Sequence, residues 1–408
     1  MSAGETHTSG AMQVWFMPQI ILWRLREFEM PRRFIGRAGS QSRKAAPSPR
    51  TGGLTIRRWL PCVVLAASGC SDGGSRAQPV PEFTLTGGRH VDDQAIGRAD
   101  ALVTTDRYLW IADGNGDPFL HLVDLQSGAV SQSFGRRGDG PGDYRGARPI
   151  FVDPDASDGV IVYDGPLRRL TRLRADAAGG AQVGRITTLA GLVPIPRRLG
   201  ALGSGYVGWL ADSAPRWVIL DADATPIRYS DGPLVGPVDV HWQQRVNASS
   251  TLSICGRPDG SGFAVAYGSA GRIELYDSLA TLLGLAAVPD SSDGDFVTVE
   301  GFGSELRWRN ARYFYGGCAA TDRFLFALYS GKPEGKPEEM NWGGSTVQVF
   351  DWKGHLISML RLPVAMAEIA IDRSGVLLFG SSADGSVVHR FDVPTELQGP
   401  LPGAGPSQ

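Results

Sequence analysis

A glycine-rich segment that carries three arginines is the first place in the sequence where ligand chemistry is expected. The charged and aromatic members of residues 135–145 are Arg136, Arg137, Asp139, Asp143, Tyr144 and Arg145. Guanidinium groups bind carboxylates and phosphates through paired hydrogen bonds, so the segment is a candidate binding loop. The alternative is a connector between strands, in which the glycines serve turns and the arginines pair with the acids of the same loop.

A second candidate is the stretch 306–315, in which arginines alternate with aromatic residues. Trp308, Arg309 and Tyr313 could form a rim that binds a sugar or a peptide. In the alternative interpretation, the aromatic side chains of this stretch pack between sheets and bind nothing.

The sequence offers no set of residues typical of catalysis. The 6 histidines are scattered and form no HxH or HExxH motif, so a zinc site is not expected. A Gly-x-Ser-x-Gly elbow and a Walker loop are both missing from the sequence. Asp153 and Asp372 stand in turn motifs, where aspartates cap their own turn more often than they bind calcium. We therefore predict no catalytic residues and no cofactor.

Four cysteines are present, and two of them fall in the body of the chain. Cys255 and Cys318 occupy similar places in two consecutive repeats, so they could lie on neighbouring strands. A disulfide between them requires Cα atoms within about 7 Å of each other. Two buried free thiols are the alternative.

The elements that must position these residues are short strands. From residue 80 onward, apolar residues alternate in runs of four to eight and are interrupted by Gly, Pro, Asp and Ser. Residues 108–113, 119–124 and 129–134 are examples of such runs. With 54 Gly and 27 Pro in 408 residues, a helical bundle is excluded, and 42% hydrophobic content excludes a disordered chain.

The strands group into units of about 40–50 residues, which is the period of propeller blades. Six such units fit between residues 80 and 395, which predicts an all-β, six-bladed β-propeller with four-stranded antiparallel blades. The last unit shows three strands, so we expect the N-terminal strand at 82–86 to join the last blade and close the ring. A β-sandwich pair or a seven-bladed ring is the alternative.

Two motifs give a family resemblance. Residues 134–144 read FGRRGDGPGDY and resemble the FGRxGxGPGEF-type loop of bacterial six-bladed β-propeller lipoproteins. The segments LYSG at 328–331 and VFDWKG at 349–354 resemble the end of the TolB-like six-bladed propeller lipoproteins. Asp143 departs from the Glu that is usual in the family. The resemblance covers residues 80–394 and implies a propeller on a lipid anchor, without implying a reaction.

Residues 57–70 have the parts of an export signal: two arginines, a short apolar run and small residues. Ala67–Cys70 resembles a lipobox, which predicts that Cys70 is lipid-modified and anchors the protein to a bacterial membrane. We expect a periplasmic or cell-surface location, at the outer rather than the inner membrane.

These features divide the chain into five parts. We expect a leader at 1–53 that is disordered or lies upstream of a start at Leu54, and a signal peptide at 54–69. A flexible tether at 70–79, the propeller at 80–395 and a flexible tail at 396–408 follow. Residues 1–69 hold ten basic and three acidic side chains, a net charge of +7; the remainder holds 30 basic and 39 acidic ones, a net charge of -9.

An acidic body argues against a nucleic-acid partner, since phosphate binding needs clustered positive charge. We therefore expect a non-catalytic module that binds a protein, peptide or glycan. The alternative is a hydrolase or lactonase-type enzyme with Ca²⁺ or another divalent metal in the central channel. Asp100, Asn247, Asn310 and Glu368 are the oxygen-bearing residues that could serve it.

Overall fold

The structure is a computed structural model in which part of the chain is described. The described residues are 79–86, 88–91, 96–189, 191–211, 215–236, 245–246, 249, 252–289, 295–299, 305–309, 312–333 and 343–398. The predicted leader, signal peptide and lipid-modified Cys70, and the tether before residue 79, lie outside them. Within the described residues, no helix is long and apolar enough to cross a membrane.

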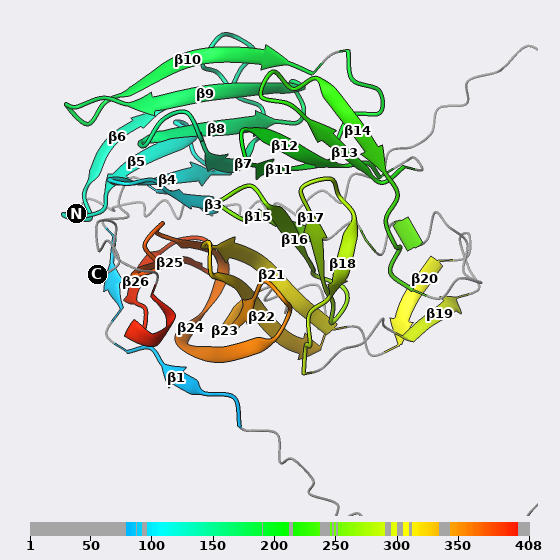
Figure 1. The fold of residues 1–408 in the computed structure, drawn as a ribbon. Coiled ribbons are helices and arrows are strands. Elements are labelled where there is room, and N and C mark those ends of the chain that lie inside the picture. Colours follow the sequence, from blue (N-terminus) through cyan, green and yellow to red (C-terminus); the bar gives the residue numbers. More distant parts are fainter. Residues whose placement is uncertain are drawn as a thin grey trace, which may run out of the picture. The chain divides into compact units, whose positions relative to one another are not determined.

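Four antiparallel sheets of four strands follow one another along the chain (Figure 1). In each sheet the strands are hydrogen-bonded in chain order. The first sheet holds β3 (Ala99–Thr104), β4 (Tyr108–Asp113), β5 (Leu120–Asp124) and β6 (Val130–Phe134). The second holds β7 (Ala147–Val152), β8 (Gly159–Asp164), β9 (Arg169–Ala175) and β10 (Ala181–Thr188). The third holds β11 (Arg198–Leu202), β12 (Gly205–Trp209), β13 (Trp217–Leu220) and β14 (Pro226–Ser230). The fourth holds β15 (Leu252–Gly256), β16 (Gly262–Tyr267), β17 (Ile273–Asp277) and β18 (Leu282–Leu285).

The last part of the chain forms one curled sheet of eight strands. Its strands are β21 (Arg312–Ala320), β22 (Phe324–Pro333), β23 (Gly344–Asp351), β24 (Leu356–Ile371), β25 (Leu377–Ser382), β26 (Val388–Asp392), β2 (Arg89–His90) and β1 (Glu82–Thr84). The first half of β24 pairs with β23 and its second half pairs with β25. One long strand therefore ends one four-stranded unit and begins the next. A separate hairpin of β19 (Asp295–Val299) and β20 (Glu305–Arg309) precedes this sheet.

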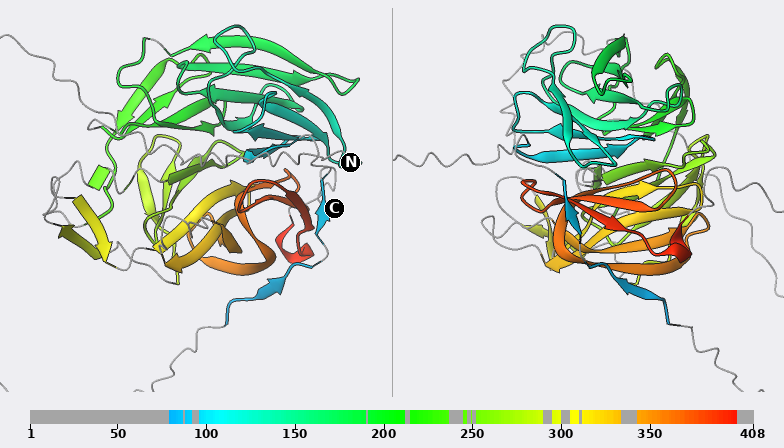
Figure 2. Two further views of the ribbon diagram at one scale, coloured as in Figure 1. Left: turned by 180° about the vertical axis from the view of Figure 1, so that it is seen from behind. Right: turned by 90° about the vertical axis from the view of Figure 1, so that its left-hand side faces the viewer.

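An N-terminal strand pairs with the final strand β26 and closes the ring, but it is not the predicted one. β2 pairs antiparallel with β26, and the Val91 amide extends the pairing by donating to the Val388 carbonyl at 2.9 Å. The predicted residues, 82–86, lie elsewhere: β1 pairs parallel with the first half of β24, along its outer edge (Figure 2). The reason is side-chain fit, because Leu85 is buried in that part of the core. Glu82 also pairs with Arg361 through two hydrogen bonds of 2.8 and 3.1 Å.

The first strand of each unit contacts the first strand of the next. The contacts run β3 to β7, β7 to β11, β11 to β15, β15 to β21 and β21 to β24, and β24 returns to β3. This cyclic order identifies the fold as an all-β propeller with antiparallel, four-stranded blades.

The core lies between neighbouring blades. Second strands such as β4, β8 and β16 are buried at every residue, whereas outer strands such as β14 are largely exposed. Between the third and fourth sheets, Phe263 stacks on Tyr276 with ring centroids 4.8 Å apart, and Trp217 meets both rings edge-on. Aromatic packing of this kind adds to the burial of apolar area that holds adjacent blades together.

Cys255 on β15 and Cys318 on β21 form a disulfide, with Cα atoms 6.0 Å apart. Of the two states left open by the sequence, the structure therefore contains the bridge. It links the first strands of two consecutive blades.

The C-terminal tail begins later than the predicted residue 396. Thr395–Leu397 forms a short 3-10 helix, and Leu397 is buried against the last sheet. The packed body thus continues past residue 395, because this leucine fills the core next to Phe391 and Val393.

The propeller has two different faces. On one of them, turns join first to second strands and touch across blades: the Asp106 amide donates to the Ser157 carbonyl, and Arg257 donates to that of Asp322. We call this the hairpin face. The opposite face consists of the turns between second and third strands and the connections between blades. We call it the connection face.

Candidate functional site

The predicted binding loop at 135–145 connects β6 to β7 on the connection face. Arg145 donates to both carboxylate oxygens of Asp139, at 2.5 and 2.6 Å, and Arg136 lies 3.4 Å from Asp143. Arg137 lies over the ring of Phe119, 4.8 Å from its centroid. The loop thus compensates its own charges, which is the geometry of the connector alternative. Its role in binding stays a prediction.

The same loop is fixed from beneath by Arg169. This side chain donates to the carbonyl oxygens of Asp139 at 3.2 Å, Gly140 at 3.1 Å and Asp143. Tyr144 is fully buried between blades, and burial raises the pKa of its hydroxyl to about 12. Tyr144 therefore acts as a core residue that holds the loop, out of reach of a ligand on the surface.

The second predicted site is dispersed. Trp308 and Arg309 belong to β20, where they pair with Phe296 and Asp295 of β19, and their side chains lie outside the described residues. Tyr313 is at the start of β21, half-buried and opposite Lys332 of β22. The described contacts do not bring these three side chains together.

Charged side chains gather where the first strands begin on the connection face. We call this group the axial cluster: Arg98, Asp100, Arg148, Arg198 and Glu368. Asp100 on β3 lies 2.8 Å from the Arg98 guanidinium and 3.6 Å from that of Arg148 on β7. The cluster therefore combines groups from four blades at the axis of the ring.

Two groups of the axial cluster have perturbed acidity. Burial raises the pKa of Glu368 to about 8, against the opposing effects of Arg148 and Arg198. Burial also lowers the pKa of Arg198, and the neighbouring charge of Arg148 lowers it further. Positive charge at the axis is thus only partly compensated near neutral pH, where Glu368 is largely protonated.

Glycines leave the space that the two carboxylates occupy. A Cβ atom added to Gly317 of β21 would lie 2.5 Å from the Glu368 carboxylate, and one added to Gly114 would lie 1.7 Å from that of Asp100. Real Cβ atoms do not approach so closely. The small residues on β21 and after β4 are therefore part of what positions the acids.

The described part of this donor set does not suit a divalent metal. Of the four residues considered for one, Asp100 and Glu368 lie in the axial cluster, whereas Asn247 and Asn310 fall outside the described residues. Among the described residues, no group of three or more His, Cys, Asp or Glu side chains could hold a metal ion. Three arginines surround the two acids, and their charges would repel a cation.

The aspartates of the turns are engaged with their own backbone. Asp153 accepts from the Asp155 amide at 3.1 Å and pairs with Arg172 at 2.5 Å, and Asp372 accepts from the amides of Ser374 and Leu377. These are the turn-capping contacts expected from the sequence.

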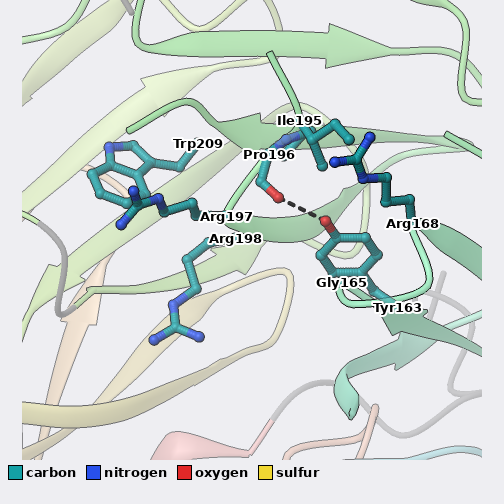
Figure 3. Close-up of a pocket in the computed structure, with 8 residues that line it drawn as sticks. All are labelled: Tyr163, Gly165, Arg168, Ile195, Pro196, Arg197, Arg198 and Trp209. Carbon is teal, nitrogen blue, oxygen red and sulfur yellow. Dashed lines mark hydrogen bonds between the residues drawn. The ribbon is translucent and has the colours of Figure 1, made fainter. Parts of the chain in front are cut away.

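An open cleft of about 590 Å³ lies between the second and third sheets on the connection face (Figure 3). Its lining residues are Tyr163, Gly165, Arg168, Ile195, Pro196, Arg197, Arg198 and Trp209. We call it the arginine cleft. Arg198 belongs both to this cleft and to the axial cluster, so the two sites adjoin.

Each wall of the arginine cleft is held by the fold. Arg168 stands in the β8–β9 turn with φ 53°, and its amide donates to the Gly165 carbonyl at 3.1 Å. On the other wall, the Tyr163 hydroxyl donates to the Pro196 carbonyl at 2.6 Å, directly before Arg197 and Arg198. Trp209 lines the cleft beside Arg197 and is itself buried, with Arg216 over its ring.

These arginines were not predicted from the sequence. A repeated motif could have indicated them. Pro166-Leu-Arg-Arg and Pro196-Arg-Arg each place an arginine pair at the beginning of a strand. Only the ring places the two segments side by side, because they are separated along the chain by the whole of β9 and β10.

Comparisons with known proteins show a likeness to solved structures but none to a protein family or a curated protein. No protein-family model matches the sequence, and no curated protein matches it. Among solved structures, the RRP9 WD40 repeats are similar at 11% identity and TM-score 0.47, over 78% of this chain and 99% of that one. A duf4221-family protein from Bacteroides vulgatus is similar at 12% identity and TM-score 0.47, over 75% and 95%. The Cps50 (Swd1) β-propeller domain of Myceliophteria thermophila is similar at 10% identity and TM-score 0.42, over 76% and 100%. Likeness at this level carries no information on ligands.

Proposed function

We propose that the chain is an exported lipoprotein, anchored through Cys70, whose propeller binds a protein, peptide or glycan partner without catalysis. The lipobox-like end of the signal and the motifs shared with TolB-like propeller lipoproteins support the anchor. The proposed location is the periplasmic or outer face of the bacterial envelope, at the outer rather than the inner membrane.

We further propose that the ring has six blades. Four blades are the separate four-stranded sheets. The curled sheet supplies two more if β24 is divided at its change of partner, with β21–β23 on one side and β25, β26 and β2 on the other. The six first strands that contact one another in cyclic order support this count.

The observation that carries the binding function is the arginine cleft. It is open to solvent, it is lined by guanidinium and aromatic groups, and it adjoins the axial cluster. Binding sites typically combine a concave surface with a few placed polar groups. Arg is also among the residue types that contribute most to affinity at protein interfaces.

The position of β1 also favours the connection face as the binding surface. β1 runs parallel to the first half of β24, and Glu82 is opposite Met359, near the turn at 351–355 on the hairpin face. The described chain therefore enters the propeller at Glu82 near the hairpin face, away from the connection face that carries the arginine cleft.

Site-specific photo-crosslinking in native membranes tests this proposal. A photo-reactive amino acid replaces Pro166, exposed in the β8–β9 turn beside the arginine cleft, or, as a matched control, Pro154, exposed on the hairpin face of the same blade. We expect a discrete adduct from position 166 and none from position 154. Adducts at 154 alone, or at neither position, would contradict the proposed binding face.

A further inference from the structure

We propose that the arginine cleft recognises an acidic peptide segment, whose side-chain carboxylates pair with Arg168, Arg197 and Arg198. This inference rests on the proposed binding function and specifies its ligand. It is independent of which protein carries the segment.

The first support is the excess of positive over negative charge in the lining of the cleft. Three of the eight lining residues are arginines and none is acidic. Arg168 forms no ion pair among the described residues, in contrast to Arg136 and Arg145, each of which has a carboxylate of its own loop. Arg198 has no described carboxylate within salt-bridge distance, although the charge of Glu368 acts on it. A guanidinium that forms no ion pair with the protein, such as that of Arg168, is available for a ligand carboxylate.

The second support is like-charge crowding. The charge of Arg148 disfavours the charged form of Arg198, while Glu368 is the acid that opposes it. A bound carboxylate would add a negative charge next to this pair and relieve the repulsion. The electrostatics of the cleft therefore select an anion over a neutral ligand.

The third support is size and shape. A cleft of about 590 Å³ falls in the range that accommodates a multi-atom ligand and exceeds what a single small anion fills. Figure 3 shows Arg168 and Arg197 on opposite sides of Pro196, with Arg198 directed away from both. Guanidinium groups spread in this way fit several carboxylates along a chain. The apolar atoms of Ile195 and Pro196 between them can contact the aliphatic parts of such a chain.

The test is calorimetric titration of the full chain, solubilised in detergent, with a blocked tetraglutamate peptide. A blocked tetraglutamine peptide of the same length is the neutral control, and inorganic phosphate is the small-anion control. The variants are Arg168→Gln and Arg198→Gln. The matched control is Arg185→Gln, on the outer strand β10, where Arg185 pairs with Asp223.

We expect tetraglutamate to bind and tetraglutamine not to bind. Each cleft variant should weaken binding about tenfold, as expected for one charge-assisted hydrogen bond, and Arg185→Gln should leave it unchanged. If Arg168→Gln fails to fold, because its turn conformation is unusual, Arg198→Gln alone decides the matter.

Two results would overturn the inference. One is that tetraglutamate does not bind the wild type, or binds the cleft variants and the Arg185→Gln control with equal affinity. The other is phosphate binding at the same affinity as the peptide, which would indicate a small-anion site. A crosslinked partner at position 166 together with no tetraglutamate binding would overturn the acidic specificity alone and leave the binding function standing.

Discussion

The Tyr163 hydroxyl donates a 2.6 Å hydrogen bond to the carbonyl oxygen of Pro196, and this bond joins two consecutive blades beneath the arginine cleft. Tyr163 is the last residue but one of β8, next to the turn that carries Arg168, and Pro196 directly precedes Arg197. Burial raises the pKa of Tyr163 to about 12, so the hydroxyl keeps its proton throughout the physiological range. The bond therefore sets the spacing between the two arginine-bearing walls.

Replacing Tyr163 with phenylalanine should lower the free energy of unfolding by about 1–3 kcal/mol, because the buried Pro196 carbonyl loses its donor. Urea denaturation followed by tryptophan fluorescence measures the change. Tyr229→Phe is the control, since Tyr229 is 43% exposed on the outer strand β14 and should tolerate the change. Equal effects of the two substitutions would show that the bond contributes nothing.

The raised pKa of Glu368 predicts a pH-dependent stability. Its pKa rises from 4.5 to about 8 on folding, so the folded protein binds a proton that the unfolded chain has lost. Stability from this group is therefore lost as pH rises from about 4.5 through about 8. Glu368→Gln, which carries no titrating proton, should be more stable than the wild type at pH 9 and nearly equal to it at pH 4.5.

Denaturation midpoints at the two pH values measure this effect. Glu396→Gln is the control, because Glu396 is exposed and should show no such dependence. A difference between Glu368→Gln and the wild type that is the same at pH 4.5 and pH 9 would refute the assignment.

Gly317 and Glu368 should show energetic coupling. Gly317→Ala places a Cβ atom 2.5 Å from the present position of the Glu368 carboxylate and should destabilise the protein by about 1 kcal/mol. In a Glu368→Ala background the same substitution should be almost neutral, because the space is then empty. A double-mutant cycle on thermal or urea stability gives the coupling energy, and additive effects would argue against this packing.

The bridge between Cys255 and Cys318 should be a large contributor to stability. It closes a segment with a sequence separation of 63, for which the chain-entropy relation gives about 4 kcal/mol. The double substitution Cys255→Ala with Cys318→Ala should lower the denaturation midpoint. Reductant should lower the wild-type midpoint but not that of the variant; a response of both, or of neither, would exclude a stabilising bridge.

Strands were predictable from the sequence where burial imposes a pattern. The predicted strand 108–113 coincides with β4, and 119–124 differs from β5 by one residue. Both are continuous apolar runs between turns, because blade packing covers both faces of an inner strand. The repeat period then indicated blades.

Ring closure and the site depended on contacts that no local pattern encodes. Residues 82–84 and 89–90 are both short edge strands, and their sequences do not specify whether β24 or β26 is the partner. The arginines at 136 and 145 were the visible candidates, yet their loop supplies carboxylates for them. Arg168 and Arg198 line one cleft only through the packing of the second blade on the third.

One measurement tests both the proposed binding face and the acidic specificity of the arginine cleft. It is the yield of the crosslinked adduct at position 166 in native membranes, with and without added tetraglutamate. We expect that tetraglutamate suppresses the adduct and that tetraglutamine at the same concentration leaves its yield unchanged. An adduct that persists at saturating tetraglutamate would contradict the claim that the partner binds this cleft through acidic side chains.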